Sequence, residues 1–300
     1  MSYELGVVMP TRNRAAMLEH AIASVPRDVE VVVVDDASSD STSSVLVKLG
    51  DRIRHTRMVV SGGPCAARNA GVMLSTADRI LFLDDDDVML PGATELIRAA
   101  CADTPDTLLH MFNCEWSDGA TSVEPTMPTM PIDYRRWLGG EFSVELKPVV
   151  HRDLFAQRQF EDTGAGGEGL LWGQVIRDLG ALAVGSPIVR YNVGHAERLT
   201  SPSGLLERSE LNAAIADRWL ELFGADQRRY APRAWHSRVM AAAFYHAVSG
   251  HRPHVLRLAQ TQGLATHDRA AITALVAMPR PALRTMFRIR SRLSGAPQRR

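Results

Sequence analysis

Short apolar runs alternate with one-faced helical patterns along the first 115 residues of this chain. The runs Leu5–Met9 and Glu30–Val34 have the length of buried strands, and Ala15–Val25 between them carries its apolar side chains on one helical face. Strands that alternate with helices favour a mostly parallel sheet with helices on both faces, which is an α/β fold. The same patterns predict strands at Ile53–Val60, Ile80–Leu83 and Leu108–Cys114, and helices at Ser41–Leu49, Cys65–Leu74 and Pro91–Cys101.

Regularity fades after residue 115. The glycine-rich joint Gly164–Gly167 precedes a predicted helix over Glu168–Leu179, and Ala183–Tyr191 is predicted to form a final strand. From Leu205 onward the pattern is entirely helical. We therefore expect an α/β domain over residues 1–204, with a ligand-binding half at 1–115 and a second half at 116–204, followed by a C-terminal helical region at 205–300.

Composition limits the classes of partner. The chain has 34 Lys and Arg against 34 Asp and Glu, so its formal net charge is zero and no general attraction to nucleic acid is expected. Its three cysteines have no C-x-x-C spacing, which favours reduced, mostly buried thiols. The N-terminus lacks an uninterrupted apolar region, and no stretch approaches the roughly 20 apolar residues of a membrane span. We expect a cytoplasmic protein.

Four consecutive aspartates, Asp84–Asp87, follow the predicted strand Ile80–Leu83. Like charges at the end of a buried strand are costly unless a cation neutralises them. Hard oxygen ligands suit Mg²⁺ or Mn²⁺, which often bridge a carboxylate and a substrate phosphate. A solvated acidic turn that caps the helix beginning near Pro91 is the alternative, and for an isolated run it would be favoured.

Polar segments at the ends of neighbouring strands favour a binding site over a cap. They are Pro10–Asn13, Asp35–Asp40 and Ser61–Pro64, and ligands of such sheets bind beyond the carboxyl ends of the strands. Capping explains Ser38 to Ser41 well, but it does not explain Asp36. The glycine pair at 62–63 lets backbone approach a ligand and opens a helix N-terminus, which favours anions. Arg68 on that helix has a fork that matches oxyanions.

The chain resembles the inverting family 2 glycosyltransferases of the Rossmann-like GT-A fold in four ordered motifs: MPTRNR, VVVVDDASSDST, GGPCAARNAG and ILFLDDDDVMLPG. The resemblance covers about the first 200 residues. It implies a nucleotide-sugar donor, usually UDP-linked, a Mn²⁺ or Mg²⁺ cofactor, and a carbohydrate, lipid-linked sugar or small molecule as acceptor. It also implies donor contacts from Pro10, Thr11, Arg12, Asn13, Asp36, Gly63, Arg68, Asp84 and Asp85, and metal coordination by Asp84 and Asp86, with Asp86 as the direct ligand.

The catalytic base is less clearly marked. Similar proteins have a Glu-Asp pair at the start of a helix, and the Asp of that pair is the base. Here Glu168 occupies the first position but Gly169 replaces the Asp, so Glu168 is the first candidate, with Asp162 and Glu161 as alternatives. A first-turn acid that only stabilises the helix dipole explains Glu168 nearly as well. His195 falls where similar proteins often have a histidine near the metal or diphosphate, although a lone histidine is more often structural.

Two other functions fit part of the pattern. A sugar-nucleotide pyrophosphorylase would also use an α/β sheet and a metal, but it would need a glycine-rich N-terminal loop, and Met9–Arg14 contains no glycine. A nucleotide-sugar-binding protein without catalysis is the second alternative, because Gly169 removes the usual base. Release of UDP in a metal-dependent assay separates an enzyme from a binding protein.

The C-terminal segment is basic. From Arg269 to Arg300 there are eight arginines and no acidic residue. A helix with an apolar face and an arginine face can lie on an anionic membrane surface, here the inner face of the membrane. Packing of the apolar face on the protein is the commoner arrangement and the favoured one. The apolar face comprises Leu283, Met286, Phe287 and Leu293, and the basic face comprises Arg284, Arg288 and Arg292.

Overall fold

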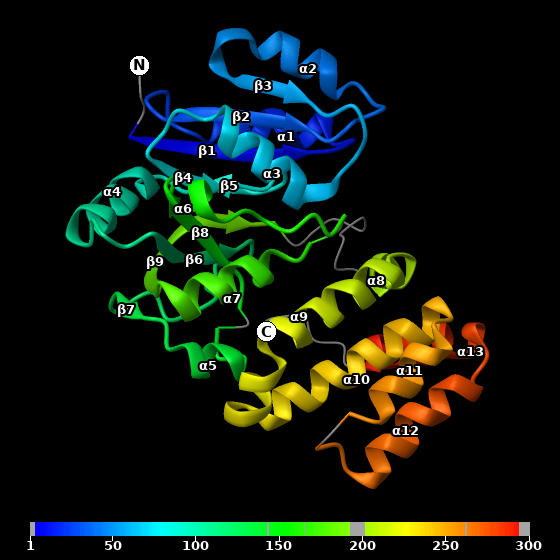
Figure 1. The fold of residues 1–300 in the computed structure, drawn as a ribbon. Helices are drawn as coiled ribbons and strands as arrows, with labels where there is room; N and C mark the ends of the chain where they lie inside the picture. Colours follow the sequence, from blue (N-terminus) through cyan, green and yellow to red (C-terminus); the bar gives the residue numbers. More distant parts are fainter. Residues whose placement is uncertain (1–3, 143, 165, 193–201, 262, 294–300) are drawn as a thin grey trace. The chain divides into compact units, whose positions relative to one another are not determined.

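The computed structural model describes residues 4–142, 144–164, 166–192, 202–261 and 263–293 (Figure 1). Contacts between residues divide the chain into two compact units. The sheet unit comprises the described residues up to Tyr134 together with those from 144 to 192. The helical unit comprises Arg135–Phe142 and the described residues from 202 onward.

Nine strands among the described residues form one sheet in the order β3-β2-β1-β4-β8-β6-β9-β5, with β7 also paired to β9. The strands are β1 (Leu5–Thr11), β2 (Glu30–Asp35), β3 (Arg54–Arg57), β4 (Arg79–Phe82), β5 (Val88–Met89), β6 (Leu109–Trp116), β7 (Met130–Pro131), β8 (Leu146–His151) and β9 (Leu182–Tyr191). The helices of this unit are α1 (Ala15–Ala23), α2 (Thr42–Leu49), α3 (Gly63–Leu74), α4 (Ala93–Asp103), α6 (Leu154–Gln157) and α7 (Glu168–Asp178).

The first half of the sheet is parallel. β1 pairs in parallel with β2 and β4, and β2 pairs in parallel with β3. Because side chains alternate along a strand, Val7 joins Leu18 of α1 in the main core, whereas Val8 faces α3 on the opposite side. Gly71 lets α3 approach closely, since a Cβ there would lie 2.4 Å from Val8 Cγ1. The predicted helices on both faces are confirmed.

Beyond β4 the sheet is mixed. β8 is antiparallel to β4 and β6, β6 is parallel to β9, and β5 and β7 are antiparallel to β9. The predicted α/β class is confirmed, and the sheet departs from a mostly parallel one only in this half. Parallel neighbours need a crossover, usually a helix, and the strictly alternating pattern of the sequence ends near residue 115.

The helical unit is built around a separate apolar core. Its members include Trp235, Val239, Ile272 and Leu283. The confirmed C-terminal helical region thus has a core of its own. The chain enters this unit within α5 (Tyr134–Leu138), and the other helices are α8 (Pro202–Glu207), α9 (Ser209–Tyr230), α10 (Pro232–Ser249), α11 (Arg252–Ala259), α12 (Thr266–Ala277) and α13 (Arg280–Leu293).

The apolar face of α13 packs within the helical unit. Leu283 has no exposed surface, and the ring of Phe287 stacks on Phe244 of α10 with centroids 5.3 Å apart. Met286 is exposed, as are Arg284 and Arg288. The favoured packing is therefore found for Leu283 and Phe287. The side chains of Arg292 and Leu293 lie outside the described set, and no described helix combines the length and apolar composition needed to cross a bilayer.

Candidate active site

The aspartate run alternates between accessible and buried positions. The side chains of Asp84 and Asp86 are 32% and 14% exposed, whereas those of Asp85 and Asp87 are 6% and 1% exposed. The run begins just after Leu83, which is still bonded to β1 through its amide and the carbonyl of Val8. The run then forms a turn, closed by a hydrogen bond from the amide of Asp87 to the carbonyl of Asp84 at 3.1 Å, and this turn leaves the D-x-D pair, Asp84 and Asp86, on the accessible side.

Two basic side chains neutralise Asp84. Arg68, on α3, donates from Nη2 to Asp84 Oδ1 at 2.7 Å. Lys147, on β8, places its Nζ 2.9 Å from Asp84 Oδ2. Lys147 also lies 2.7 Å from Asp87 Oδ2 and 3.6 Å from a carboxylate oxygen of Glu145. The lysine is 3% exposed, so the carboxylates on the inner side share a buried ammonium.

Asp85 and Asp86 are held by the end of the first strand. Thr11 Oγ1 donates to Asp85 Oδ2 at 2.7 Å, and Arg14 Nη1 lies 3.0 Å from Asp85 Oδ1 and 2.7 Å from Asp86 Oδ2. The first-strand motif and the aspartate run, about 70 residues apart in sequence, therefore meet at adjacent strand ends. This is the crevice that the parallel half of the sheet predicts.

Charge and burial pull the pKa values of the run apart. Burial would raise the pKa of Asp84, but Lys147 and then Arg68 outweigh it and hold that pKa well below its usual range. Burial raises the pKa of Asp85 to about 6, against the opposing effects of Thr11 and Arg14. Burial also raises the pKa of Asp87, with a further contribution from the charge of Asp84. Negative charge is thus concentrated at the accessible Asp84.

Glu168 begins α7 and forms an ion pair with Arg68. The chain enters α7 through Gly167, whose φ of 99° lies in the left-handed region that favours glycine. The guanidinium of Arg68 therefore joins Glu168 to Asp84, across 84 residues of sequence. Asp162 lies close enough to act electrostatically on Cys65, while His195 lies outside the described residues.

Asp36 organises the glycine loop that precedes α3. Its carboxylate accepts hydrogen bonds from Ser61 Oγ at 2.7 Å, Gly62 N at 2.7 Å and Gly63 N at 3.0 Å. Arg12 Nη1 donates to the same Ser61 hydroxyl at 2.7 Å. Asp36 is 4% exposed, so this arrangement gives it a clear role in holding the loop.

Asn13 ties the first-strand motif to the second. It has a φ of 55°, its amide donates to Ser38 Oγ at 2.9 Å, and its side-chain oxygen accepts from the amide of Ser39 at 2.7 Å. Pro10 lies one residue before Thr11 in β1 and is half-buried. The predicted donor-binding residues from the first three motifs therefore meet around the loops that end β1 and β2.

Two residues of the site have no role predicted from the sequence. Arg14 stands within the first motif but has no predicted role, and Lys147 stands in an otherwise apolar run. A lysine within the strand Leu146–His151 is the one signal that could have drawn attention to it, because lysine is almost never buried unless paired. Its partners Asp84 and Asp87 lie about 60 residues earlier in the sequence, which no local pattern reveals.

The carboxylates present suit a divalent cation. Asp84 and Asp86 supply oxygen atoms, the ligand type that Mn²⁺ and Mg²⁺ prefer, and they are the two accessible members of the run. A cation there would share Asp84 with Arg68 and Asp86 with Arg14. The three described cysteines are free and buried, as expected, and none lies among these ligands.

Comparison with known proteins gives a consistent picture. Residues 6–136 match the model of the family described as Glycosyl transferase family 2. The Campylobacter jejuni protein named GalNAc(5)-diNAcBac-PP-undecaprenol beta-1,3-glucosyltransferase is 32% identical over 183 residues, which cover 56% of this chain and 58% of that protein. The chain thus spans less than two thirds of that relative's length.

Solved structures share the fold at low sequence identity. TarS 1–349 of S. aureus, in complex with UDP-GlcNAc, has a TM-score of 0.57 at 15% identity, over 98% of this chain and 92% of that chain. The mannosyltransferase PcManGT of Pyrobaculum calidifontis, in complex with GDP-Man and Mn²⁺, has a TM-score of 0.52 at 16% identity, over 99% and 89%. The fold is GT-A. Over residues 6–136, the chain is similar to glycosyl transferase family 2.

Proposed function

We propose that the protein is a glycosyltransferase that moves a sugar from a nucleotide-sugar donor, most simply a UDP-sugar, to an acceptor hydroxyl. One observation carries the proposal: Arg68 pairs both with Asp84 of the D-x-D pair and with Glu168, the candidate base. This pairing brings the candidate metal ligand and the candidate base to one guanidinium, which supports a transfer reaction at this site. The C. jejuni relative and the P. calidifontis neighbour, which are named as a glucosyltransferase and a mannosyltransferase, support the same class.

Arg68 has a further donor suited to a diphosphate. Its Nε is buried and has no hydrogen-bond partner among the described residues. A buried N–H without an acceptor is costly, and a phosphate oxygen would satisfy it. Two of the three guanidinium nitrogens bind carboxylates of the site, so the third is the one we assign to the donor.

The reaction we propose inverts the anomeric carbon. A divalent cation, when bound by Asp84 and Asp86, would offset the negative charge of the diphosphate. Arg68 stabilises the charge that develops as the bond to the nucleoside diphosphate breaks. The acceptor oxygen forms the new bond from the opposite face, and Glu168 takes its proton as general base. Lys147 keeps Asp84 ionised throughout the reaction, because the buried ammonium stays paired with Asp84 Oδ2.

The acceptor we propose is a carbohydrate, either free or linked to a lipid. The name of the C. jejuni relative includes an undecaprenol-linked acceptor, and this supports a lipid-linked one here. The exposed Arg284 and Arg288 of α13 are compatible with peripheral contact to an anionic membrane surface. A peripheral location on the cytoplasmic side of the membrane follows from this proposal and depends on it.

Turnover of a donor panel tests the proposal. UDP-, GDP- and dTDP-sugars are incubated with the full chain and Mn²⁺, with and without sugar acceptors, and release of the nucleotide is measured. We expect metal-dependent release from one donor class, strongest with an acceptor present. Donor binding without release of the nucleotide, against a broad acceptor panel, would instead identify a binding protein. Pyrophosphate-dependent formation of a nucleoside triphosphate would identify a pyrophosphorylase.

A further inference from the structure

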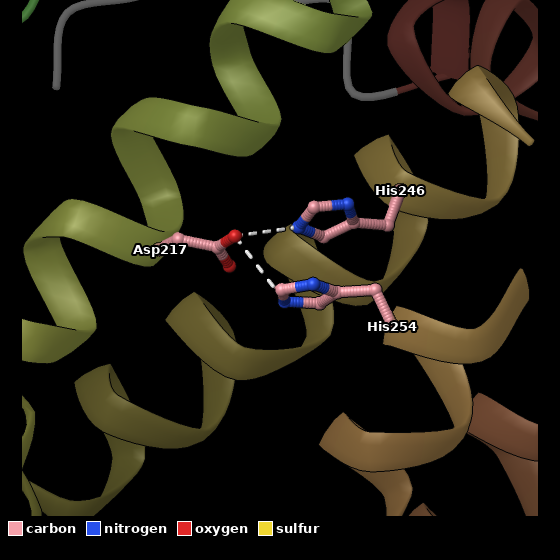
Figure 2. Close-up of side chains that lie close together, drawn as sticks. All are labelled: Asp217, His246 and His254. Atoms are coloured by element: carbon pink, nitrogen blue, oxygen red, sulfur yellow. Dashed lines mark hydrogen bonds and ion pairs between the residues drawn. The ribbon is translucent and has the colours of Figure 1, made fainter. Parts of the chain in front are cut away.

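Three metal-ligating side chains converge in the helical unit. Asp217 lies on α9, His246 in the last turn of α10 and His254 on α11, and Figure 2 shows the carboxylate facing both rings. His246 Nε2 lies 2.9 Å and His254 Nε2 lies 3.2 Å from the same atom, Asp217 Oδ2. His246 and His254 are eight residues apart in sequence, whereas Asp217 lies 29 residues before His246.

The three ligand atoms are spaced for a single ion. They all lie within 4.8 Å of one another. Zinc binds imidazole nitrogen and carboxylate oxygen at about 2.0–2.2 Å, which puts the ligand atoms of a tetrahedral site roughly 3.3 Å apart. The separations of 2.9 and 3.2 Å are close to that value. Since the side chains of Asp217 and His254 are 25% and 28% exposed, water can reach a fourth position.

The second ring nitrogen of His246 also has a partner. This nitrogen, Nδ1, lies 3.1 Å from Nδ1 of His251, which follows α10. A histidine that binds a metal through one nitrogen donates the N–H of the other, and this contact fixes the ring and its tautomer. His246 is 5% exposed, so the ring is held in place by its surroundings.

Two small movements at His254 accompany binding. Its ring is nearly parallel to that of His246, with centroids 3.8 Å apart and an angle of 17°, and an ion must lie in the plane of both rings. Rotation of His254 about its terminal torsion meets this need, and such torsions are soft. Arg257, whose Nη2 lies 2.8 Å from His254 Nδ1, is exposed and free to turn away.

We propose that Asp217, His246 and His254 form a structural site for a zinc-like divalent ion that ties α9, α10 and α11 together. Imidazole nitrogen favours zinc, cobalt and nickel over Mg²⁺ and Mn²⁺. The ion is therefore chemically distinct from the one proposed at Asp84 and Asp86. Its contribution is to the stability of the helical unit, and the proposal does not depend on the glycosyl transfer activity.

Cobalt binding to the full-length protein tests the site. The protein is treated with EDTA, and Co²⁺ is titrated while visible d–d absorption is recorded, followed by competition with Zn²⁺. We expect the intense bands of a four-coordinate site at one equivalent and their loss on addition of Zn²⁺. Zinc should also raise the unfolding temperature of the protein in a concentration-dependent way.

Matched variants separate this site from other histidines. His254→Ala and Asp217→Asn should weaken Zn²⁺ binding by more than the ~10–100-fold typical of changes to an outer partner. His236→Ala is the control, because it removes a similar histidine–aspartate contact, 2.9 Å to Asp268, without touching the cluster. Circular dichroism confirms that each variant is folded. Absence of the four-coordinate bands in the wild-type protein, or equal binding by His254→Ala, overturns the proposal.

Discussion

The ammonium of Lys147 lies 2.7 Å from Asp87 Oδ2, beneath the accessible carboxylates of the site. Both side chains are almost fully buried, so neither charge has solvent to replace its partner. The lysine also pairs with Asp84, and the three carboxylates around it raise its pKa well above the usual range although burial alone would lower it. Asp84 is therefore ionised and partly exposed to solvent, while the lysine that keeps it ionised is buried.

Replacement of Lys147 should destabilise the sheet unit. We expect Lys147→Met to lower the free energy of unfolding by about 3–5 kcal/mol, because it leaves buried carboxylates without a counter-charge. Urea unfolding at neutral pH measures the loss. Lys48→Met is the control, since its pairing with Glu19 is exposed and worth about 0–1 kcal/mol. The double variant Lys147→Met with Asp87→Asn should recover part of the stability, and failure to recover any would contradict the pairing.

Removal of Asp86 should stop the reaction. We expect Asp86→Ala to abolish transfer and to remove the Mn²⁺-dependent part of donor affinity, while the fold survives because the side chain is partly accessible. Calorimetric donor titrations with and without Mn²⁺ make the comparison. Asp51→Ala, at an exposed position in the same unit, should behave like the wild type. Full activity in EDTA, or in Asp86→Ala, would count against a metal at this site.

Glu168→Gln tests the base. The amide can still accept a hydrogen bond from Arg68 but cannot take a proton, so kcat should fall by roughly 10²-fold or more with little change in donor binding. Steady-state kinetics and a donor titration give the two numbers. Asp162→Asn and Glu161→Gln are the comparison variants. If either of these loses activity while Glu168→Gln does not, the role belongs to that residue.

The pH dependence of stability should report on Asp85. Its pKa in the folded protein is raised from 3.8 to about 6, so the folded state binds the extra proton between these values and stability falls as pH rises through that window. Asp85→Asn removes this dependence. Relative to the wild type, we expect it to gain up to about 3 kcal/mol between pH 4 and pH 7, from roughly two pKa units. A constant difference across the window would show that Asp85 does not titrate there.

The basic face of α13 gives a prediction about membranes. If contact exists, Arg284→Ser with Arg288→Ser should reduce flotation with anionic liposomes at low salt, while turnover on a small soluble acceptor is unchanged. These exposed positions are better targets than a truncation after Met278, which would remove the buried Leu283 from the core. Should the wild-type protein ignore such liposomes, a soluble acceptor becomes the better candidate.

Local sequence patterns predicted the strands and helices that are marked by apolar runs or by helical periodicity. β1, β2 and β4 follow from apolar runs, and α1 and α7 follow from periodicity and flanking glycines. β3 is shorter than predicted: the prediction for Val59 and Val60 is wrong, because the chain leaves the sheet after Arg57 and exposes both side chains. The two-residue strands β5 and β7 were not predictable, since they exist only through pairing with β9, over 50 residues later.

The candidate site divides in the same way. The aspartate run and the glycine loop are visible in sequence because like charges and glycines cluster at strand ends. The partners that control their charge are not visible: Lys147 lies about 60 residues beyond Asp84, and Glu168 lies 100 beyond Arg68. In the cluster of Asp217, His246 and His254, the two histidines are eight residues apart in sequence, but Asp217 joins them only through the packing of α9 against α10.

The start of α3 touches the loop before α7 at Gly63, where there is no room for a side chain. Gly63 has a φ of 81°, and a Cβ on it would lie 2.5 Å from the carbonyl oxygen of Gly164. Any larger residue at 63 must push the second loop, and with it the start of the helix that carries Glu168. A side chain at position 63 can therefore be accommodated only with a compensating shift of the second loop, which couples variation at position 63 to the conformation around Gly164.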